Sequence, residues 1–158
     1  MTRFPPRAHP AHLDESALRL GLAAFAAADL GLAVFMAVAP HAFYRAIGPF
    51  GARNDHYVRD VATFYAAVGV ALALAIGRPS WRVPALAVSA IQFGLHSLNH
   101  LLDIGGAHPA WVGYLDFFSL IASTAMLGWL WRISAIAGQA KQEPPVPRPH
   151  PTSQRSLT

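Results

Sequence analysis

The sequence of 158 residues contains no cysteine and has few charged residues. Without a thiol, the chain can form no disulfide, no thiolate metal site and no iron–sulfur cluster, and thiol redox chemistry within it is excluded. Charged residues make up 13% of the chain, against roughly 25% in soluble domains. A soluble domain needs charge to cover its surface, whereas lipid-facing surface does not. The composition therefore favours a membrane protein.

Apolar residues make up 54% of the chain and gather in four segments that short stretches with Gly, Pro or polar residues separate. A membrane-spanning helix needs about 20 mainly apolar residues. The segments therefore predict an all-α fold, a four-helix transmembrane bundle within residues 17–133. The expected helices cover about 18–39, 59–76, 83–103 and 110–132. Pro84 falls in the first turn of the third, where its missing N–H costs little.

Two other interpretations fit these segments less well. A soluble helical bundle would show a charged face with a period of about 3.6 residues, and these segments do not. A cleaved signal peptide is suggested by Arg3, Arg7 and Arg19, which precede the apolar residues 20–39, and by Ala37-Val38-Ala39, which resembles a cleavage site. However, this apolar stretch is longer than a usual signal core, Asp29 interrupts it, and Pro40 would follow the cut.

The flanking basic residues predict that both termini lie in the cytoplasm. In this orientation three basic residues lie outside and nine inside the membrane, the latter being Arg3, Arg7, Arg19, Arg78, Arg82, Arg132, Lys141, Arg148 and Arg155. The formal charge of +4 thus lies in tails and loops, which argues against a nucleic-acid partner. The expected location is the plasma membrane, with the lipid bilayer as the main partner.

The ends of the chain and the first outer connection have distinct compositions. Residues 1–16 and the proline-rich residues 134–158 are expected to be disordered cytoplasmic tails. Residues 40–56 mix apolar and polar side chains with Gly48, Pro49 and Gly51, which prevent a long helix. This connection is either a short amphipathic piece that covers the bundle or an ordinary loop.

Polar side chains form a stripe on the third segment. An α-helix turns by about 100° per residue. If the direction of Gln92 around the helix axis is set to 0°, the directions of the other four are about 40° for His96, 340° for Asn99, 80° for His100 and 20° for Asp103. Five polar residues therefore share about 100° of one helix face, in a segment that is otherwise apolar.

The other segments bring charged residues to the same half of the membrane. Asp29 lies near the middle of the first segment, Arg59 and Asp60 open the second, and Asp116 follows the start of the fourth. Ionisable residues in a spanning segment are costly and usually face a bundle interior or a cavity. The sequence therefore predicts an outward-facing polar pocket that contains Asp29, Arg59, Asp60, Gln92, His96, Asn99, His100, Asp103 and Asp116.

Several kinds of chemistry would suit such a pocket. His96 and His100 have i, i+4 spacing and could ligate zinc, iron or manganese, and Asp103, Asp29 or Asp116 could complete the ligand set. Haem is disfavoured because both of these histidines share one helix face. A His–Asp pair could instead carry a proton, or the polar groups could only fix helix register. No catalytic residue and no cofactor is identified.

The main functional hypothesis is therefore an accessory or ligand-binding membrane protein that associates with itself or with a membrane-complex partner. The first alternative is a metal- or quinone-linked membrane oxidoreductase that uses the same residues. The second is a structural or assembly subunit of a membrane complex.

A family resemblance rests on the start of the second segment. Arg59-Asp60-Val61, followed by Phe64-Tyr65-Ala66-Ala67-Val68-Gly69, resembles the DoxX-like small bacterial membrane proteins. The stripe from His96 to Asp103 is also similar to that of small proteins from high-GC actinobacteria. The resemblance covers residues 18–131 and implies a four-helix bundle in the cytoplasmic membrane. Some relatives are linked to thiosulfate oxidation with quinone or to redox-stress complexes, but the resemblance implies no particular reaction here.

Overall fold

The computed structural model describes residues 11–140, which form five α-helices. Their bounds are Ala11–Val38 (α1), Pro40–Ala46 (α2), Asp55–Gly77 (α3), Pro79–Leu102 (α4) and Ala110–Ala140 (α5). Within this part of the chain the only β-type pairing is an isolated bridge between Phe50 and Ala107. The predicted all-α class is confirmed.

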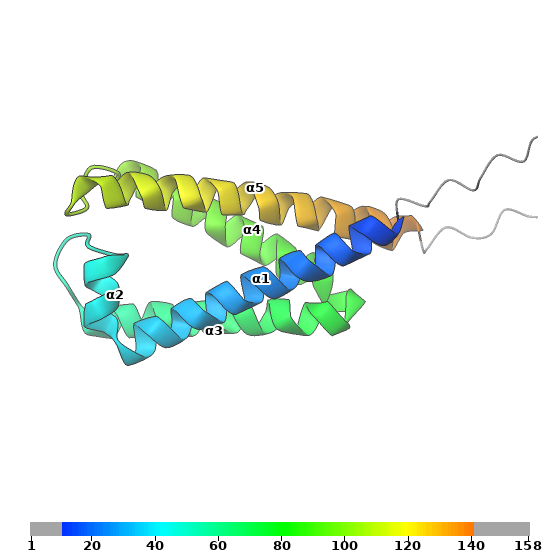
Figure 1. Ribbon diagram of the computed structural model, residues 1–158, viewed down its shortest axis with the longest axis horizontal. Coiled ribbons are helices and arrows are strands. Elements are labelled where there is room, and N and C mark those ends of the chain that lie inside the picture. Colours follow the sequence, from blue (N-terminus) through cyan, green and yellow to red (C-terminus); the bar gives the residue numbers. More distant parts are fainter. Residues whose placement is uncertain (1–10, 141–158) are drawn as a thin grey trace, which may run out of the picture.

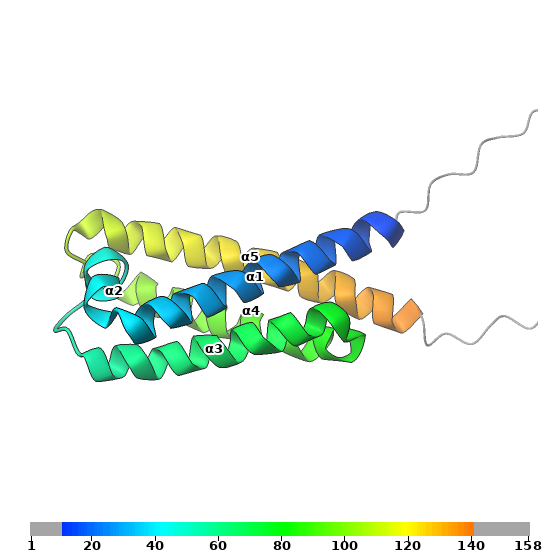
Figure 2. The ribbon, with the colours of Figure 1, turned by 60° about the horizontal axis from the view of Figure 1, so that its bottom comes forward.

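The four long helices form two pairs. α1 packs chiefly on α3, and α4 chiefly on α5, while α1 touches α5 only briefly. The first and last described residues lie at the same end of the molecule, and from there the two pairs spread apart toward α2 (Figure 1). In a second view α2 again lies at the far end, beside the starts of α3 and α5 (Figure 2). We call these two ends the terminal end and the α2 end.

Local sequence explains where the helices begin. Pro40 and Pro79 occupy the first positions of α2 and α4, where the missing N–H would have no helical partner. The Asn54 side chain caps α3 by accepting hydrogen bonds from the backbone N–H groups of His56 (3.1 Å) and Tyr57 (3.3 Å). Only Arg78 separates α3 from α4, so these helices form a tight hairpin.

A group of buried leucines lies toward the terminal end. Leu22, Leu72, Leu86, Leu127 and Leu130, contributed by all four long helices, are fully buried there. Gly69 allows α1 and α3 to pack closely, because a Cβ at this position would lie 2.8 Å from Leu30 Cγ. Gly69 and Leu30 lie near mid-length of the α1–α3 pair, so its close packing extends beyond the buried leucines.

A buried arginine connects the two helix pairs at the terminal end. Arg82 on α4 is 6% exposed, and its guanidinium donates to both carboxylate oxygens of Glu15 on α1, at 2.8 and 2.9 Å. It also donates to the carbonyl oxygens of Ala75 (3.2 Å) and Ile76 (3.5 Å) in the last turn of α3. One side chain thus holds three helices and satisfies carbonyls that a helix end leaves free.

The helix bounds differ from the expected ones mainly at the ends. Residues 11–16 and 134–140, expected to be disordered, belong to α1 and α5, whereas the rest of both tails lies outside the described residues. α4 begins before the expected position, so Pro84 lies inside the helix rather than in its first turn. Residues 40–46 form a short helix within the expected connection.

Three described helices, α1, α3 and α5, are long and apolar enough to cross a membrane, which indicates a membrane protein. The corresponding windows are Glu15–Val38, Asp55–Gly77 and Ala110–Gln139. α4 has 24 residues, which is long enough, but its polar stripe makes it less apolar than the other three. These three helices therefore account for three candidate spans, and α4 is the fourth long helix of the described chain.

Arg82→Ala should lower the free energy of unfolding by about 1–3 kcal/mol, because it leaves two α3 carbonyls without their buried donor, while Glu15 keeps Arg19 as a partner. Equilibrium unfolding in mixed micelles would measure this change. Arg78→Ala is the matched control, since Arg78 is exposed and should change stability by less than about 0.5 kcal/mol. Equal effects of the two substitutions would contradict the role given to Arg82.

Candidate functional site

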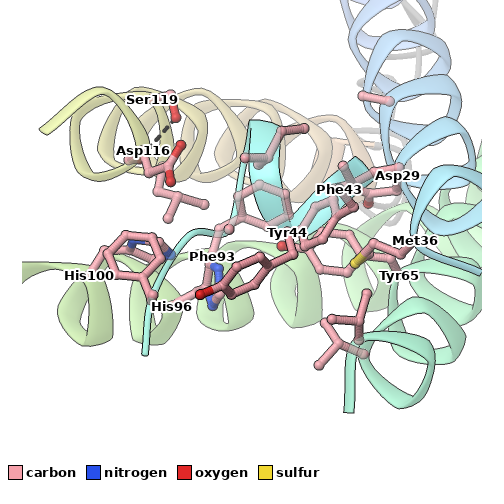
Figure 3. Close-up of a pocket in the computed structure, with 18 of the residues that line it drawn as sticks. Asp29, Met36, Phe43, Tyr44, Tyr65, Phe93, His96, His100, Asp116 and Ser119 are labelled. Carbon is pink, nitrogen blue, oxygen red and sulfur yellow. Dashed lines mark hydrogen bonds between the residues drawn. The ribbon is translucent and has the colours of Figure 1, made fainter. Parts of the chain in front are cut away.

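A cavity of about 480 Å³ lies at the α2 end, where the helix pairs diverge, and all five helices contribute to its wall. Figure 3 shows its labelled side chains arranged around a common space. The wall is mainly apolar and rich in aromatic side chains. These are Phe25, Phe43, Tyr44, Phe50, Tyr57, Tyr65 and Phe93.

Four ionisable side chains from three helices line this cavity. Asp29 comes from α1, His96 and His100 from α4, and Asp116 from α5. Asp29 is only 2% exposed, and it shares the cavity wall with Met36, Phe43 and Tyr65 (Figure 3). The structure thus brings together four of the nine residues predicted for a polar pocket.

Polar atoms around the cavity have no hydrogen-bond partner. Asp29 Oδ2, His100 Nδ1 and Asp116 Oδ2 are each buried and make no hydrogen bond with the described part of the chain. Most buried polar groups in proteins are hydrogen-bonded, and leaving one unpaired costs about 1–3 kcal/mol. Three such atoms lie around one cavity, so these polar groups do not stabilise the fold through hydrogen bonds.

The two histidines lie one turn apart on the α4 face. Their ring centroids are 4.8 Å apart in an edge-on arrangement, and the Phe50 ring packs edge-on against His100 at 4.9 Å. Asp103 is exposed and its backbone N–H ends α4 by donating to Asn99 O. Among residues 11–140, no three His, Asp or Glu side chains come together to hold a metal ion. The structure therefore does not assemble the metal site predicted from His96, His100 and Asp103.

The other predicted residues lie outside the cavity. Arg59, Asp60 and Asn99 are exposed, and Gln92 is half-buried but does not line the wall. Asp60 lies instead 3.4 Å from the exposed His56, one turn away on α3. Arg59 and Asp60 face the outer surface because α3 turns Ala62 and Tyr65 toward the neighbouring helices instead.

The direction of the α4 face explains which stripe residues reach the cavity. On the scale that puts Gln92 at 0°, the buried Ser89, Phe93 and Ser97 lie at about 60°, 100° and 140°. His96 and His100, at about 40° and 80°, fall near this buried side. Gln92, Asn99 and Asp103 lie farther round the helix. The stripe is real, but only one edge of it faces the helix bundle.

α2 and the loop after it cover the α2 end of the cavity. Phe43, Tyr44 and Phe50 contribute to the wall, and the Tyr44 hydroxyl donates to Gly51 O. The loop is joined to the α4–α5 connection by the Phe50–Ala107 bridge and by a hydrogen bond from His108 N to Pro49 O, at 3.3 Å. Of the two interpretations of residues 40–56, the structure shows the covering piece.

Sequence reasoning missed part of the site on α5 and most of its aromatic wall. Ser119 and Ser123 line the cavity together with Asp116, and their i, i+3 and i+7 spacing places all three on one helix face. That spacing was a usable signal. Tyr65 and Phe93 gave none, because buried aromatic residues in an apolar helix look like ordinary core.

Comparison of the chain with protein-family models, characterised proteins and solved structures finds no match. The cavity itself is therefore the feature of this molecule that points to a function. Its apolar wall can hold the body of a small molecule, and its carboxyl and imidazole groups can orient a polar head.

Asp29→Leu should raise the free energy of unfolding by about 1–3 kcal/mol, since it removes a buried polar group that has no partner. The cavity beside Asp29 gives the larger side chain room. Unfolding in mixed micelles would measure the gain, with Asp60→Leu as the control at an exposed acid on α3. A loss of stability in Asp29→Leu alone would show that Asp29 supports the fold.

Proposed function

We propose that this protein is a small multi-pass plasma-membrane protein that binds an amphipathic small molecule in the cavity at the α2 end. The observation that carries the proposal is the set of three unpartnered buried atoms, Asp29 Oδ2, His100 Nδ1 and Asp116 Oδ2, around one cavity. Buried polar groups without partners destabilise a protein, and such groups typically persist at functional sites.

The size and lining of the cavity suit this role. Ligand pockets commonly measure about 300–1,000 Å³ and combine apolar walls with a few polar groups, and this cavity of about 480 Å³ has that composition. Ala28 on α1 and Ser119 on α5 line it and are exposed. In a bilayer both would border lipid, which favours entry of an apolar ligand from the membrane.

The proposed topology has four spans, with both termini in the cytoplasm and α2 outside. The arrangement of basic residues supports this orientation, and the common position of the first and last described residues fits an even number of spans (Figure 1). α4 is the fourth span in this proposal. Its two histidines line the cavity. Ser89 and Ser97 are buried, and they donate to the carbonyls of Ala85 and Phe93. These four polar side chains are therefore kept away from lipid.

Single-cysteine labelling tests the topology directly, because the chain has no cysteine of its own. Ala52→Cys, in the α2–α3 loop, should react with a membrane-impermeant maleimide in intact cells. Ser80→Cys, at the start of α4, should react only after the cells are permeabilised. Labelling of both in intact cells would overturn the four-span topology.

The resemblance to DoxX-like proteins stays a prediction, and the binding role does not depend on it. The residues that carry it include the exposed Arg59, Asp60 and Phe64 as well as the cavity residue Tyr65. An oxidoreductase using the same cavity would also need to bind its substrate or quinone there. Ligand binding is thus the activity common to both hypotheses.

Native mass spectrometry of the protein released from membranes should show a bound small molecule. Ser123→Phe fills the cavity from α5 and should remove that mass. Ala122→Phe is the matched control, because Ala122 is exposed and does not line the cavity. A bound mass that survives Ser123→Phe, or no bound mass in any form, would contradict the proposed binding site.

A further inference from the structure

We propose that the ligand is a lipophilic amine, bound as its ammonium ion against Asp29, with Asp116 as the second carboxylate of the site. This inference rests on the proposed binding function and adds the chemical class of the ligand. It depends on the charges that line the cavity, the nature of its wall and the hydrogen-bonding capacity left unused in it.

The cavity contains two carboxyl groups and two imidazoles, and the described residues give it no permanently cationic side chain. Asp29 and Asp116 line it, whereas no Lys or Arg among residues 11–140 does. Arg82, which is buried, is engaged by Glu15 at the terminal end. An anionic ligand would meet two acids with no compensating cation, while an ammonium ion would neutralise a carboxylate that is costly to bury alone.

The unused hydrogen-bonding capacity also suits an ammonium group. Asp29 Oδ2 and Asp116 Oδ2 are acceptors when ionised and have no donor in the described chain. An ammonium group brings three N–H donors and no acceptor, and hydrogen bonds between charged partners are the stronger kind. Asp29 is the principal partner, because only 2% of it is exposed.

The wall beside Asp29 is aromatic. The Phe93 ring packs edge-on against Phe25, with centroids 6.1 Å apart, and against Tyr65, with centroids 6.4 Å apart. Phe43 approaches from α2 on the same side of the cavity as Asp29 (Figure 3). Aromatic faces attract cations, with stronger effects away from water, and the same rings bury an apolar ligand body. A carboxylate in a cavity with an aromatic wall therefore favours a cation with an apolar substituent.

Three probes with one apolar body and different head groups test this class. We would compare 4-phenylbutylammonium, 4-phenylbutanol and 4-phenylbutanoate by calorimetric titration of the full chain in lipid nanodiscs, with empty nanodiscs subtracted to remove partitioning. The ammonium probe should bind about tenfold more tightly than the alcohol, and the carboxylate should bind most weakly. Asp29→Asn should lower affinity for the ammonium about tenfold while leaving the alcohol nearly unchanged.

Matched variants separate the possible results. Asp60→Asn removes an acid of the same type from the exposed face of α3 and should change none of the affinities. If Asp29→Asn fails to fold, Asp116→Asn together with the wild-type order of the probes decides the question. Equal affinities for ammonium and alcohol would overturn the ligand class while leaving the proposed binding function intact. Binding of none of the probes, together with a co-purifying anionic ligand, would also overturn the class.

A different outcome would remove the proposed function itself. The decisive result would be that all three probes bind weakly and that Ser123→Phe changes neither their affinity nor any co-purifying mass. The cavity would then not be a binding site, and the proposed ligand class would fail with it. The two failures are therefore distinguishable in one set of measurements.

Discussion

A buried polar group in an apolar helix bundle is costly unless it is hydrogen-bonded, and the two ends of this molecule differ in how they meet that requirement. At the terminal end Arg82 makes four hydrogen bonds that join α1, α3 and α4. At the α2 end Asp29, His100 and Asp116 keep atoms without partners. The first end is therefore built for cohesion, and the second retains polarity that the fold does not use.

The two ends depend on one another. Because the helix pairs are joined by Arg82 and the leucine core at one end, they can separate at the other without coming apart (Figure 1). The opening is then bridged by backbone pairing between the α2–α3 loop and the α4–α5 connection, through Phe50 and Ala107. A cavity is thus held between two closed ends, and its polar groups are placed by rigid helices rather than by loops.

Much of the fold could be predicted because lipid imposes simple constraints on length and hydropathy. Apolar segments of about 20 residues located the four long helices, and the turn between α3 and α4 falls at Arg78, within the expected gap between residues 76 and 83. The ends were harder. Polar residues such as Glu15 looked like tail, yet Glu15 lies in α1, where it binds Arg19 one turn away and also Arg82, 67 residues away. A contact at that separation leaves no local pattern in the sequence.

The candidate site could be predicted only in part, for a geometric reason. Helical periodicity fixes the angles between residues on one helix but not the direction in which that helix faces its neighbours. The α4 stripe was therefore correctly grouped, but the buried side is centred near Phe93, which leaves Asn99 and Asp103 exposed. The direction of Asp29 and Asp116 was easier to predict, because a single acid in an apolar helix is least costly when it faces the interior of the bundle. Isolated ionisable residues were thus better guides to the cavity than the margins of a broad polar stripe.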